Sequence, residues 1–168
     1  LATGGTIAGA GATGTQSGYK SGAVGIDTMV AAVPGIADLA TIKGEQISNV
    51  GSQDMSFAIL LTVAKRINEL AKSADVDGFV ITHGTDTTEE TAVLLDLVHD
   101  DPRPVVLTGA QRASDTADGD GPRNRADAIL VAASRRARGL GVLIAFAGRV
   151  LPARGTRKVH TAALAAFG

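Results

Sequence analysis

Hydroxyl and carboxylate side chains gather at two turns of this chain, each directly after a short apolar stretch. Thr6 lies in a glycine-rich turn near the start, and Thr85 and Asp86 follow the apolar residues 78–82. A threonine hydroxyl becomes a good nucleophile only when a neighbouring base takes its proton. A single turn threonine more often bonds its own backbone, so these residues suggest chemistry only if the fold brings them together.

Residues 78–82 have the apolar, β-branched composition of a buried parallel strand, and apolar residues then recur at helical spacing over 94–98. Thr87 and Glu90 fit a capping box that would begin this helix. We expect the same succession of strand and helix elsewhere in the chain. Further strands are expected at residues 103–107 and 141–147, and helices at 27–33, 35–39, 124–137 and around a stripe of Leu60, Ala64, Ile67 and Ala71.

This alternation predicts an α/β fold: a doubly wound, mostly parallel sheet with helices on both faces, in the three layers of Rossmann-like and flavodoxin-like domains. In such sheets ligands bind where the carboxyl ends of the strands meet. Polar clusters follow the expected strands around Thr6, Ser52, Thr85 and Thr108. The sequence therefore predicts one pocket rich in hydroxyls and amides, with Asp86 as its carboxylate.

The composition narrows the class of protein. With 168 residues and 45% hydrophobic content, the chain suits one globular domain. A net charge of −1 and 3% aromatic residues favour a small-molecule substrate over nucleic acid. We expect no membrane partner, because no stretch is long and apolar enough to span a bilayer. Leu1 and Ala2 suggest the end of a strand whose earlier residues are missing.

Residues 9–25 are rich in glycine and show no periodicity, so we expect a mobile loop. Long loops in compact domains are often lids, which makes Tyr19, the only tyrosine, a candidate contact. Residues 9–14 match the dinucleotide pattern G-x-G-x-x-G, but no helix is expected after them to receive a pyrophosphate. A nucleotide-binding module is therefore the weaker alternative.

Metal and cofactor sites are not expected. The chain has no cysteine, and its three histidines lack the spacing of a zinc site. Residues 116–127 resemble a calcium loop, but Thr116 occupies the first ligand position and no glutamate occupies the twelfth. A solvated polar loop is the simpler interpretation.

Residues 3–9 (TGGTIAG) and 83–92 (HGTDTTEETA) resemble, in this order, the two signature motifs of bacterial-type L-asparaginases. Residues 44–46 (GEQ) and 51–55 (GSQDM) are similar to the type II branch, and the resemblance covers essentially all 168 residues. It implies an amidohydrolase that converts L-asparagine to L-aspartate and ammonia, with glutaminase as a side activity. The reaction would pass through a threonine nucleophile and an acyl-enzyme.

The resemblance also implies catalytic roles for individual residues. Thr6 would attack the side-chain amide, and Tyr19, on the flap, would assist it. Thr85, Lys158 and Asp86 would form a proton relay. The family's pattern does not settle which threonine acts in which step.

Substrate-binding roles follow from the same resemblance. Ser52 and Gln53 would hold the α-carboxylate of the substrate, and Asp86 would accept its α-ammonium group. The backbone around Ala110 would contribute to the site of the substrate amide. Residues 111–113 read Gln-Arg-Ala, where Met-Arg-Pro is commoner in the family.

Members of the family are about twice as long as this chain, with a smaller C-terminal domain. Residues 1–168 are therefore expected to be the N-terminal α/β domain, truncated at its first strand and lacking the C-terminal domain. The complete enzyme would be a homotetramer that acts on L-asparagine or L-glutamine. The type II resemblance favours a periplasmic or secreted location, with a cytoplasmic one as the alternative. A non-catalytic domain that binds an acidic amino acid is the alternative function.

Overall fold

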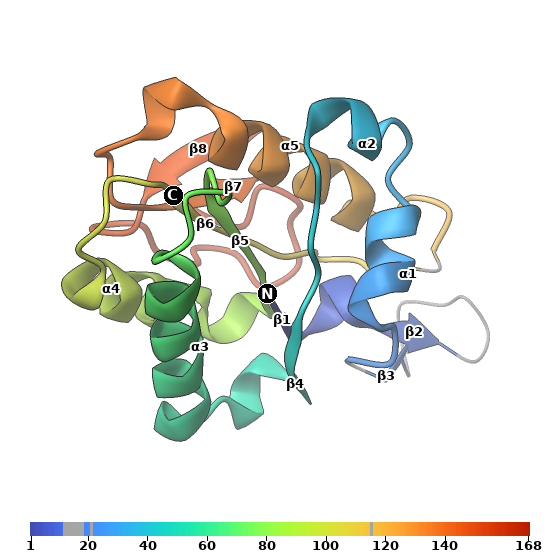
Figure 1. Cartoon of the computed structure of the whole chain (residues 1–168). Helices are drawn as coiled ribbons and strands as arrows, with labels where there is room; N and C mark the ends of the chain where they lie inside the picture. The colour runs from blue at the N-terminus through green and yellow to red at the C-terminus, as the bar shows by residue number, and fades with distance from the viewer. Residues whose placement is uncertain (12–18, 21, 115) are drawn as a thin grey trace.

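The computed structural model of the chain describes residues 1–11, 19–20, 22–114 and 116–168. A six-stranded sheet lies at its centre (Figure 1). The strands of this sheet are β1 (Ala2–Gly4), β4 (Gln46–Val50), β5 (Phe79–Thr82), β6 (Val105–Thr108), β7 (Val142–Phe146) and β8 (Arg149–Pro152). They lie in the order β4-β1-β5-β6-β7-β8, with β8 antiparallel to β7 and the other neighbours parallel.

The strand order contains a switch point between β1 and β5. After β1 the chain adds β4 on one side, and then crosses back to add β5, β6 and β7 on the other side. The connections that leave β1 and β5 therefore diverge at the carboxyl ends of these two strands. Open α/β sheets bind their ligands in the crevice that such a divergence creates.

Helices cover both faces of the sheet. Helices α3 (Phe57–Leu70) and α4 (Thr88–Val98) contribute to one apolar core, and α5 (Gly121–Ala133) contributes to the other. Side chains of a strand alternate between the cores, so Leu107 lies with α3 and α4 whereas Val106 lies with α5. The predicted fold class, a doubly wound and mostly parallel sheet, is confirmed.

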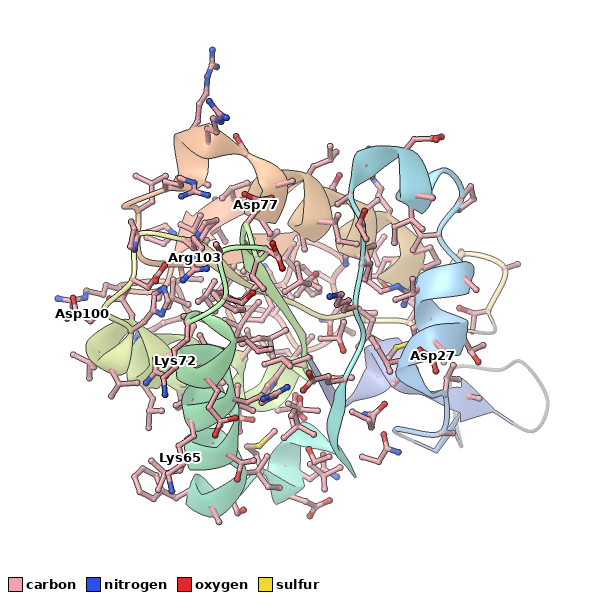
Figure 2. All side chains as sticks on the ribbon, viewed as in Figure 1. Asp27, Lys65, Lys72, Asp77, Asp100 and Arg103 are labelled. Atoms are coloured by element: carbon pink, nitrogen blue, oxygen red, sulfur yellow. The ribbon has the colours of Figure 1, made fainter. Side chains whose placement is uncertain are left out.

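Helix α3 buries Ala64 and Ile67 of the predicted stripe, whereas Leu60 and Ala71 are only partly buried. Val63, Ala64 and Ile67 are buried against the sheet, whereas Lys65 lies on the exposed side of the helix (Figure 2). Ser56 caps the helix, because its hydroxyl accepts a hydrogen bond from a first-turn N–H at 3.3 Å. Burial of each large apolar side chain contributes about 1.5 to 3 kcal/mol, which fixes α3 on the sheet.

Helix α4 begins where expected, but the predicted capping box is wrong. Thr87 is the N-cap residue and makes no side-chain capping hydrogen bond. Its hydroxyl instead donates to the carbonyl oxygen of Ser52 at 2.9 Å. A long-range contact between two turns has taken the place of the local cap.

Helix α5 begins and ends earlier than the expected residues 124–137. Pro122 lies in its first turn, where the missing N–H costs nothing. At the other end Ser134 adopts an extended conformation, and its hydroxyl accepts from the N–H of Arg136 at 3.3 Å. The chain then continues as the 3-10 helix η4 (Arg135–Ala137).

The ends of the expected loop 9–25 form a short ribbon. Strands β2 (Ala10–Gly11) and β3 (Tyr19–Lys20) pair antiparallel, and residues 12–18 and 21 lie outside the described part of the chain. Two short helices follow as expected, α1 (Ile26–Ala31) and α2 (Ile36–Leu39). In the described parts of the chain, no helix has the length and apolarity needed to cross a membrane.

Candidate active site

A cavity of about 140 Å³ lies at the carboxyl end of the sheet, beside the turns that follow β1 and β5. Three short 3-10 helices carry polar residues to it: η1 (Thr6–Ala8), η2 (Ser52–Asp54) and η3 (Thr85–Thr87). These turns follow β1, β4 and β5, as the predicted convergence of polar clusters requires. The lining residues are Gly5, Thr6, Ser52, Gln53, Thr85, Asp86, Gln111, Lys158 and Thr161.

The fourth predicted cluster reaches the cavity through Gln111 and not through Thr108. Thr108 is buried, and its hydroxyl donates to the carbonyl oxygen of Ala145 at 2.8 Å, which ties β6 to β7. Ala110 is also buried and is not among the lining residues. The contribution of its backbone to the site therefore stays a prediction.

Two glycines allow the turns after β1 and β5 to meet. Gly5 has a φ of 79°, a conformation that side chains of L-residues rarely adopt. A Cβ atom at Gly5 would lie 2.3 Å from the Cα atom of Gly84. Because this close approach requires the absence of a side chain, the glycines place Thr6 and Thr85 on one cavity.

Lys158, Thr85 and Asp86 form a connected polar group in the cavity. The Lys158 ammonium donates to the Thr85 hydroxyl oxygen at 2.7 Å and to the Asp86 carboxylate at 2.7 Å. The lysine side chain is 15% exposed and that of Asp86 is 57% exposed. The predicted relay residues therefore lie in mutual contact, with the carboxylate still open to solvent.

The backbone holds Lys158 in place from the segment that follows β8. Its N–H donates to the carboxylate of Glu89 on α4, and the residue pairs with Phe167 in an isolated β-bridge. Phe167 in turn packs edge-on against Phe146 of β7. This packing brings the lysine to Thr85.

Ser52 connects the turn after β4 with the turn after β5. Its hydroxyl oxygen accepts from the N–H of Asp86 at 3.1 Å, so its own proton remains available to a ligand. Gln53 is exposed, and its amide donates to Asp54 at 3.0 Å. Both predicted carboxylate-binding residues therefore lie at the cavity beside Asp86.

His83 supports the site from behind. It is fully buried, with Nδ1 2.7 Å from the carbonyl oxygen of Gly84 and Nε2 3.0 Å from the Thr91 hydroxyl. A carbonyl oxygen only accepts, so Nδ1 carries the proton and Nε2 accepts from Thr91. Burial lowers the pKa of His83, and the hydrogen bond to Gly84 opposes this in part. His83 therefore acts as a neutral brace for the turn.

The other predicted residues lie at different places relative to the cavity. Thr6 lies in η1 and lines the cavity, as predicted. Tyr19 lies in β3, but its side chain is outside the described part, so its role stays a prediction. Three lining residues, Gly5, Gln111 and Thr161, have no role assigned from the sequence. Gln111 belongs to a recognised polar cluster, whereas nothing in the sequence pattern distinguishes Thr161.

The acidic loop before α5 has a structural role. The Asp120 carboxylate accepts from the backbone N–H groups of Gln111 and Arg112, at 3.0 Å each, and from the Asn124 amide at 3.1 Å. It thereby fixes the turn that presents Gln111. Within the described residues, no group of three His, Asp or Glu side chains is arranged to hold a metal ion.

Comparison with known proteins shows close relatives. The chain is 51% identical over 167 residues to the "Probable L-asparaginase periplasmic" of Haemophilus influenzae and 48% identical over 167 residues to "L-asparaginase 2" of Escherichia coli. Each alignment covers 99% of this chain and 47% of the relative. The chain thus spans about half the length of these curated relatives.

A solved structure shares the fold of this chain. The crystal structure of a probable cytoplasmic L-asparaginase from Campylobacter jejuni matches with a TM-score of 0.96 and 45% identity, over 99% of this chain and 51% of that one. The sequence also matches the family described as "Asparaginase, N-terminal" over residues 1–168. Because this match covers the whole chain and the relatives are so similar, the chain belongs to the asparaginase N-terminal family.

Proposed function

We propose that this chain carries the catalytic residues of an L-asparaginase, an amidohydrolase that converts L-asparagine to L-aspartate and ammonia. One observation carries the proposal. Two threonines, Thr6 and Thr85, line one cavity, and the Lys158 ammonium lies 2.7 Å from the Thr85 hydroxyl oxygen. A hydroxyl, a base and a carboxylate in one pocket are the parts that amide hydrolysis by covalent catalysis needs.

In the proposed reaction the Thr6 oxygen attacks the side-chain amide carbon of asparagine, and the hydroxyl proton passes to a base. The C–N bond then breaks, and the leaving nitrogen takes up a proton to depart as ammonia. Water hydrolyses the resulting ester to aspartate and restores the hydroxyl. Thr85 and Lys158 relay the protons, and Tyr19 assists Thr6 from the flap. Lys158 can act as a base only after it has lost its own proton.

We expect polar side chains of the cavity to bind the charged groups of the substrate. The α-ammonium group of the substrate binds the Asp86 carboxylate, whose side chain is 57% exposed beside its contact with Lys158. The Ser52 hydroxyl donates its available proton to the α-carboxylate, and Gln53 contributes its amide. The Ala110 backbone binds the side-chain amide. This arrangement selects a free amino acid.

L-Glutamine is proposed as a side substrate. It differs from asparagine by one methylene group, which a pocket discriminates by only about 1 to 3 kcal/mol. The residues that line the cavity of about 140 Å³ are polar apart from Gly5, so the cavity offers few apolar contacts that would distinguish the two substrates. Glutaminase activity should therefore accompany asparaginase activity at a lower rate.

We also propose that residues 1–168 are the N-terminal α/β domain of a longer protein that assembles as a homotetramer. The chain covers only 47% of its curated relatives, which supports a further C-terminal domain. The alternative function is a non-catalytic domain that binds an acidic amino acid through Ser52, Gln53 and Asp86. The two functions differ in one measurable product, ammonia.

The test compares variants of the full-length protein. Thr6→Ala and Thr85→Val should each reduce ammonia release by roughly 100-fold or more while aspartate binding remains measurable by calorimetry. Asp86→Ala should instead weaken aspartate binding. Thr62→Val, at an exposed threonine of α3, is the matched control and should change neither. Aspartate binding without ammonia release in the parent protein would support the binding domain and exclude the enzyme.

A further inference from the structure

Gln111 lines the cavity and connects it to residues 161–163, in the segment that follows β8. Its side-chain oxygen lies 3.2 Å from the Thr85 hydroxyl oxygen. Its side-chain nitrogen donates to the carbonyl oxygens of Thr161 at 3.1 Å and Ala163 at 3.0 Å. Asp120 holds the backbone of Gln111, so the side chain is anchored at both ends.

These partners fix the direction of each hydrogen bond. The carbonyl oxygens of Thr161 and Ala163 can only accept, so the nitrogen of the Gln111 amide faces them and its oxygen faces Thr85. An amide oxygen also only accepts. Thr85 must therefore donate its single proton to Gln111, and the Thr85 oxygen accepts from the Lys158 ammonium.

We propose that Gln111 is a positioning residue that holds the Thr85 proton away from Lys158 and thereby keeps Lys158 in its charged, donating form in the resting site. The inference rests on the amidohydrolase function proposed above. For Lys158 to take the Thr85 proton, Lys158 must be neutral and the Thr85 hydroxyl must turn away from Gln111. Gln111 thus opposes the transfer of the Thr85 proton to Lys158.

Two carboxylates also hold Lys158 in its donating position. Asp86 accepts from its ammonium at 2.7 Å, and Glu89 accepts from its backbone N–H. Gln111 is the neutral member of this group and departs from the residue common in the family at this position. A variant at Gln111 therefore changes the relay without removing either carboxylate.

Two variants should shift the pH dependence in opposite directions. Gln111→Met keeps the length of the side chain but removes the acceptor, so Thr85 can turn its proton toward a neutral Lys158. Activity should then rise at a lower pH. Gln111→Glu places a carboxylate two hydrogen bonds away from the ammonium and favours the charged lysine. Activity should then rise at a higher pH.

The experiment measures kcat and KM for asparagine against pH in the full-length protein. The acid limb of kcat should move by about half a pH unit or more in each variant, downward for Gln111→Met and upward for Gln111→Glu. Both Gln111 variants should also raise KM by roughly 3-fold, because neither side chain can donate the two hydrogen bonds to residues 161–163. The control is Gln46→Met, which removes donors to the carbonyl oxygens of Ala2 and Ser48 at the opposite end of β4.

An unmoved acid limb in Gln111→Met, or shifts of the same sign in both Gln111 variants, would overturn the positioning role while leaving the asparaginase function intact. A shift in Gln46→Met as large as that in Gln111→Met would also overturn it, because a general loss of stability would then explain the effect. A parent protein that releases no ammonia from asparagine would instead overturn the proposed function, and the role of Gln111 with it.

Discussion

Individual threonines in one short stretch have different roles, although their chemistry is the same. Thr85 lines the cavity, while Thr87 donates to the carbonyl oxygen of Ser52 at 2.9 Å. Thr88 donates to the carbonyl oxygen of Gly84 at 2.8 Å, and Thr91 contacts His83 at 3.0 Å. Three hydroxyls thus hold the turn that places Thr85 at the cavity. The residue type alone does not distinguish these roles.

His83 should make the folded state sensitive to mild acid. Burial lowers its pKa below the ordinary value of 6.5, so the folded protein resists a proton that the unfolded chain accepts. The stabilising effect is fully present above pH 6.5 and is lost progressively as the pH falls toward the lowered pKa. Urea unfolding at several pH values should therefore show a free energy of unfolding that decreases from about pH 7 to about pH 5.

An NMR titration tests the same expectation at the ring itself. The His83 resonances should stay at the positions of the neutral, Nδ1-protonated form as the pH falls below the ordinary histidine value of 6.5. A His83 ring that gains its proton at pH 6.5 or above would contradict the prediction.

At the scale of elements, the contact between the turns after β1 and β5 depends on Gly5. Gly5→Ala would place a Cβ atom 2.3 Å from the Cα atom of Gly84 and strain a φ of 79°. We expect a loss of about 3 kcal/mol or more in the free energy of unfolding and little remaining activity, because Thr6 would shift from Thr85. Urea unfolding and ammonia release of the full-length variant measure both effects.

Gly139→Ala is the matched control for the glycine prediction. Gly139 has a similar φ of 77°, but a Cβ atom there would meet nothing within 4 Å. The Gly139→Ala variant should lose only about 1 kcal/mol of unfolding free energy, from backbone strain, and its activity should not change. Equal losses for the two variants would show that strain, and not the close approach of the turns, explains the role of Gly5.

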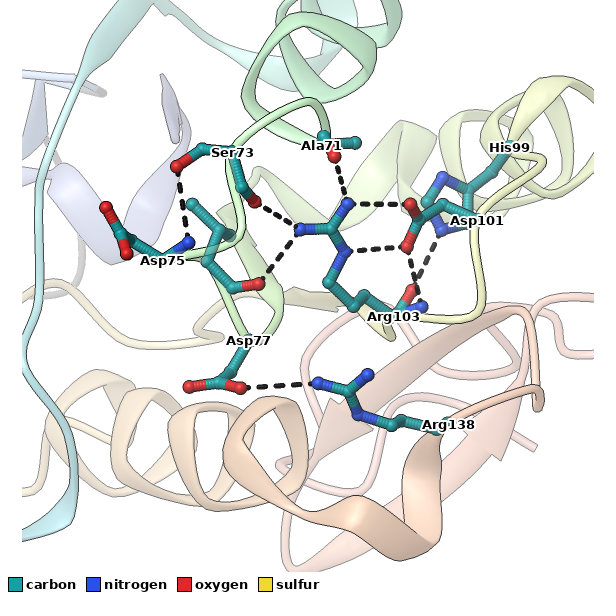
Figure 3. Close-up of polar contacts among 9 residues, drawn as sticks. Ala71, Ser73, Asp75, Asp77, His99, Asp101, Arg103 and Arg138 are labelled. Carbon is teal, nitrogen blue, oxygen red and sulfur yellow. Dashed lines mark hydrogen bonds and ion pairs between the residues drawn. The ribbon is translucent and has the colours of Figure 1, made fainter.

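Arg103 clamps the opposite end of the sheet, as Figure 3 shows. Its guanidinium donates to both carboxylate oxygens of Asp101, at 2.7 Å each, and holds the pKa of Asp101 at about 2. It also donates to the carbonyl oxygens of Ala71, Ser73 and Val76. One side chain therefore ties the loop after α3 to the loop before β6.

Arg103→Lys should destabilise the fold by about 2 kcal/mol, because an ammonium cannot reach this set of acceptors and leaves backbone carbonyls without partners. Thermal and urea unfolding measure the loss, and kcat should stay unchanged because the clamp lies away from the cavity. Arg136→Lys, at an exposed arginine of η4, should be neutral. An Arg103→Lys variant as stable as the parent would show that these contacts of Arg103 do not stabilise the fold.

The sheet and its helices could be predicted because their signals are local. Residues 78–82 and the stripe containing Ala64 and Ile67 have the composition and spacing that define a buried strand and a one-sided helix. The predicted capping box at Thr87 failed because its hydroxyl bonds Ser52, 35 positions away. Gln111 and Thr161 likewise became part of the site through contacts that no local pattern encodes.

At the scale of the molecule, the cavity combines two distant parts of the chain. The turns after β1, β4 and β5 supply Thr6, Ser52 and Thr85, and the segment beyond β8 supplies Lys158 and Thr161. The parallel strands fix the turns, because the strands share one sheet. The segment beyond β8 is held by the bridge between Lys158 and Phe167 and by the burial of Phe167 in the apolar core. The position of the proposed base therefore depends on the packing of this segment.

Apolar side chains near this segment are exposed in the chain alone. Val150, Val159 and Leu164 are 51%, 57% and 41% exposed, and the last two follow Lys158 in the same segment. Since the chain covers about half the length of its relatives, we expect the rest of the proposed longer protein to cover such side chains. That cover would hold Lys158 against Thr85.

Residues 1–168 expressed alone should therefore hydrolyse asparagine much more slowly than the full-length protein, by roughly 100-fold or more, because a small displacement of a catalytic group is enough to cost this factor. The measurement is ammonia release from both proteins side by side, with circular dichroism to compare their folding and light scattering to compare their oligomeric states. The full-length Thr85→Val variant marks the rate expected without a working relay. If a folded monomeric fragment turned over asparagine as fast as the full-length protein, the site would be complete in this domain and the proposed dependence on the rest of the protein would be wrong.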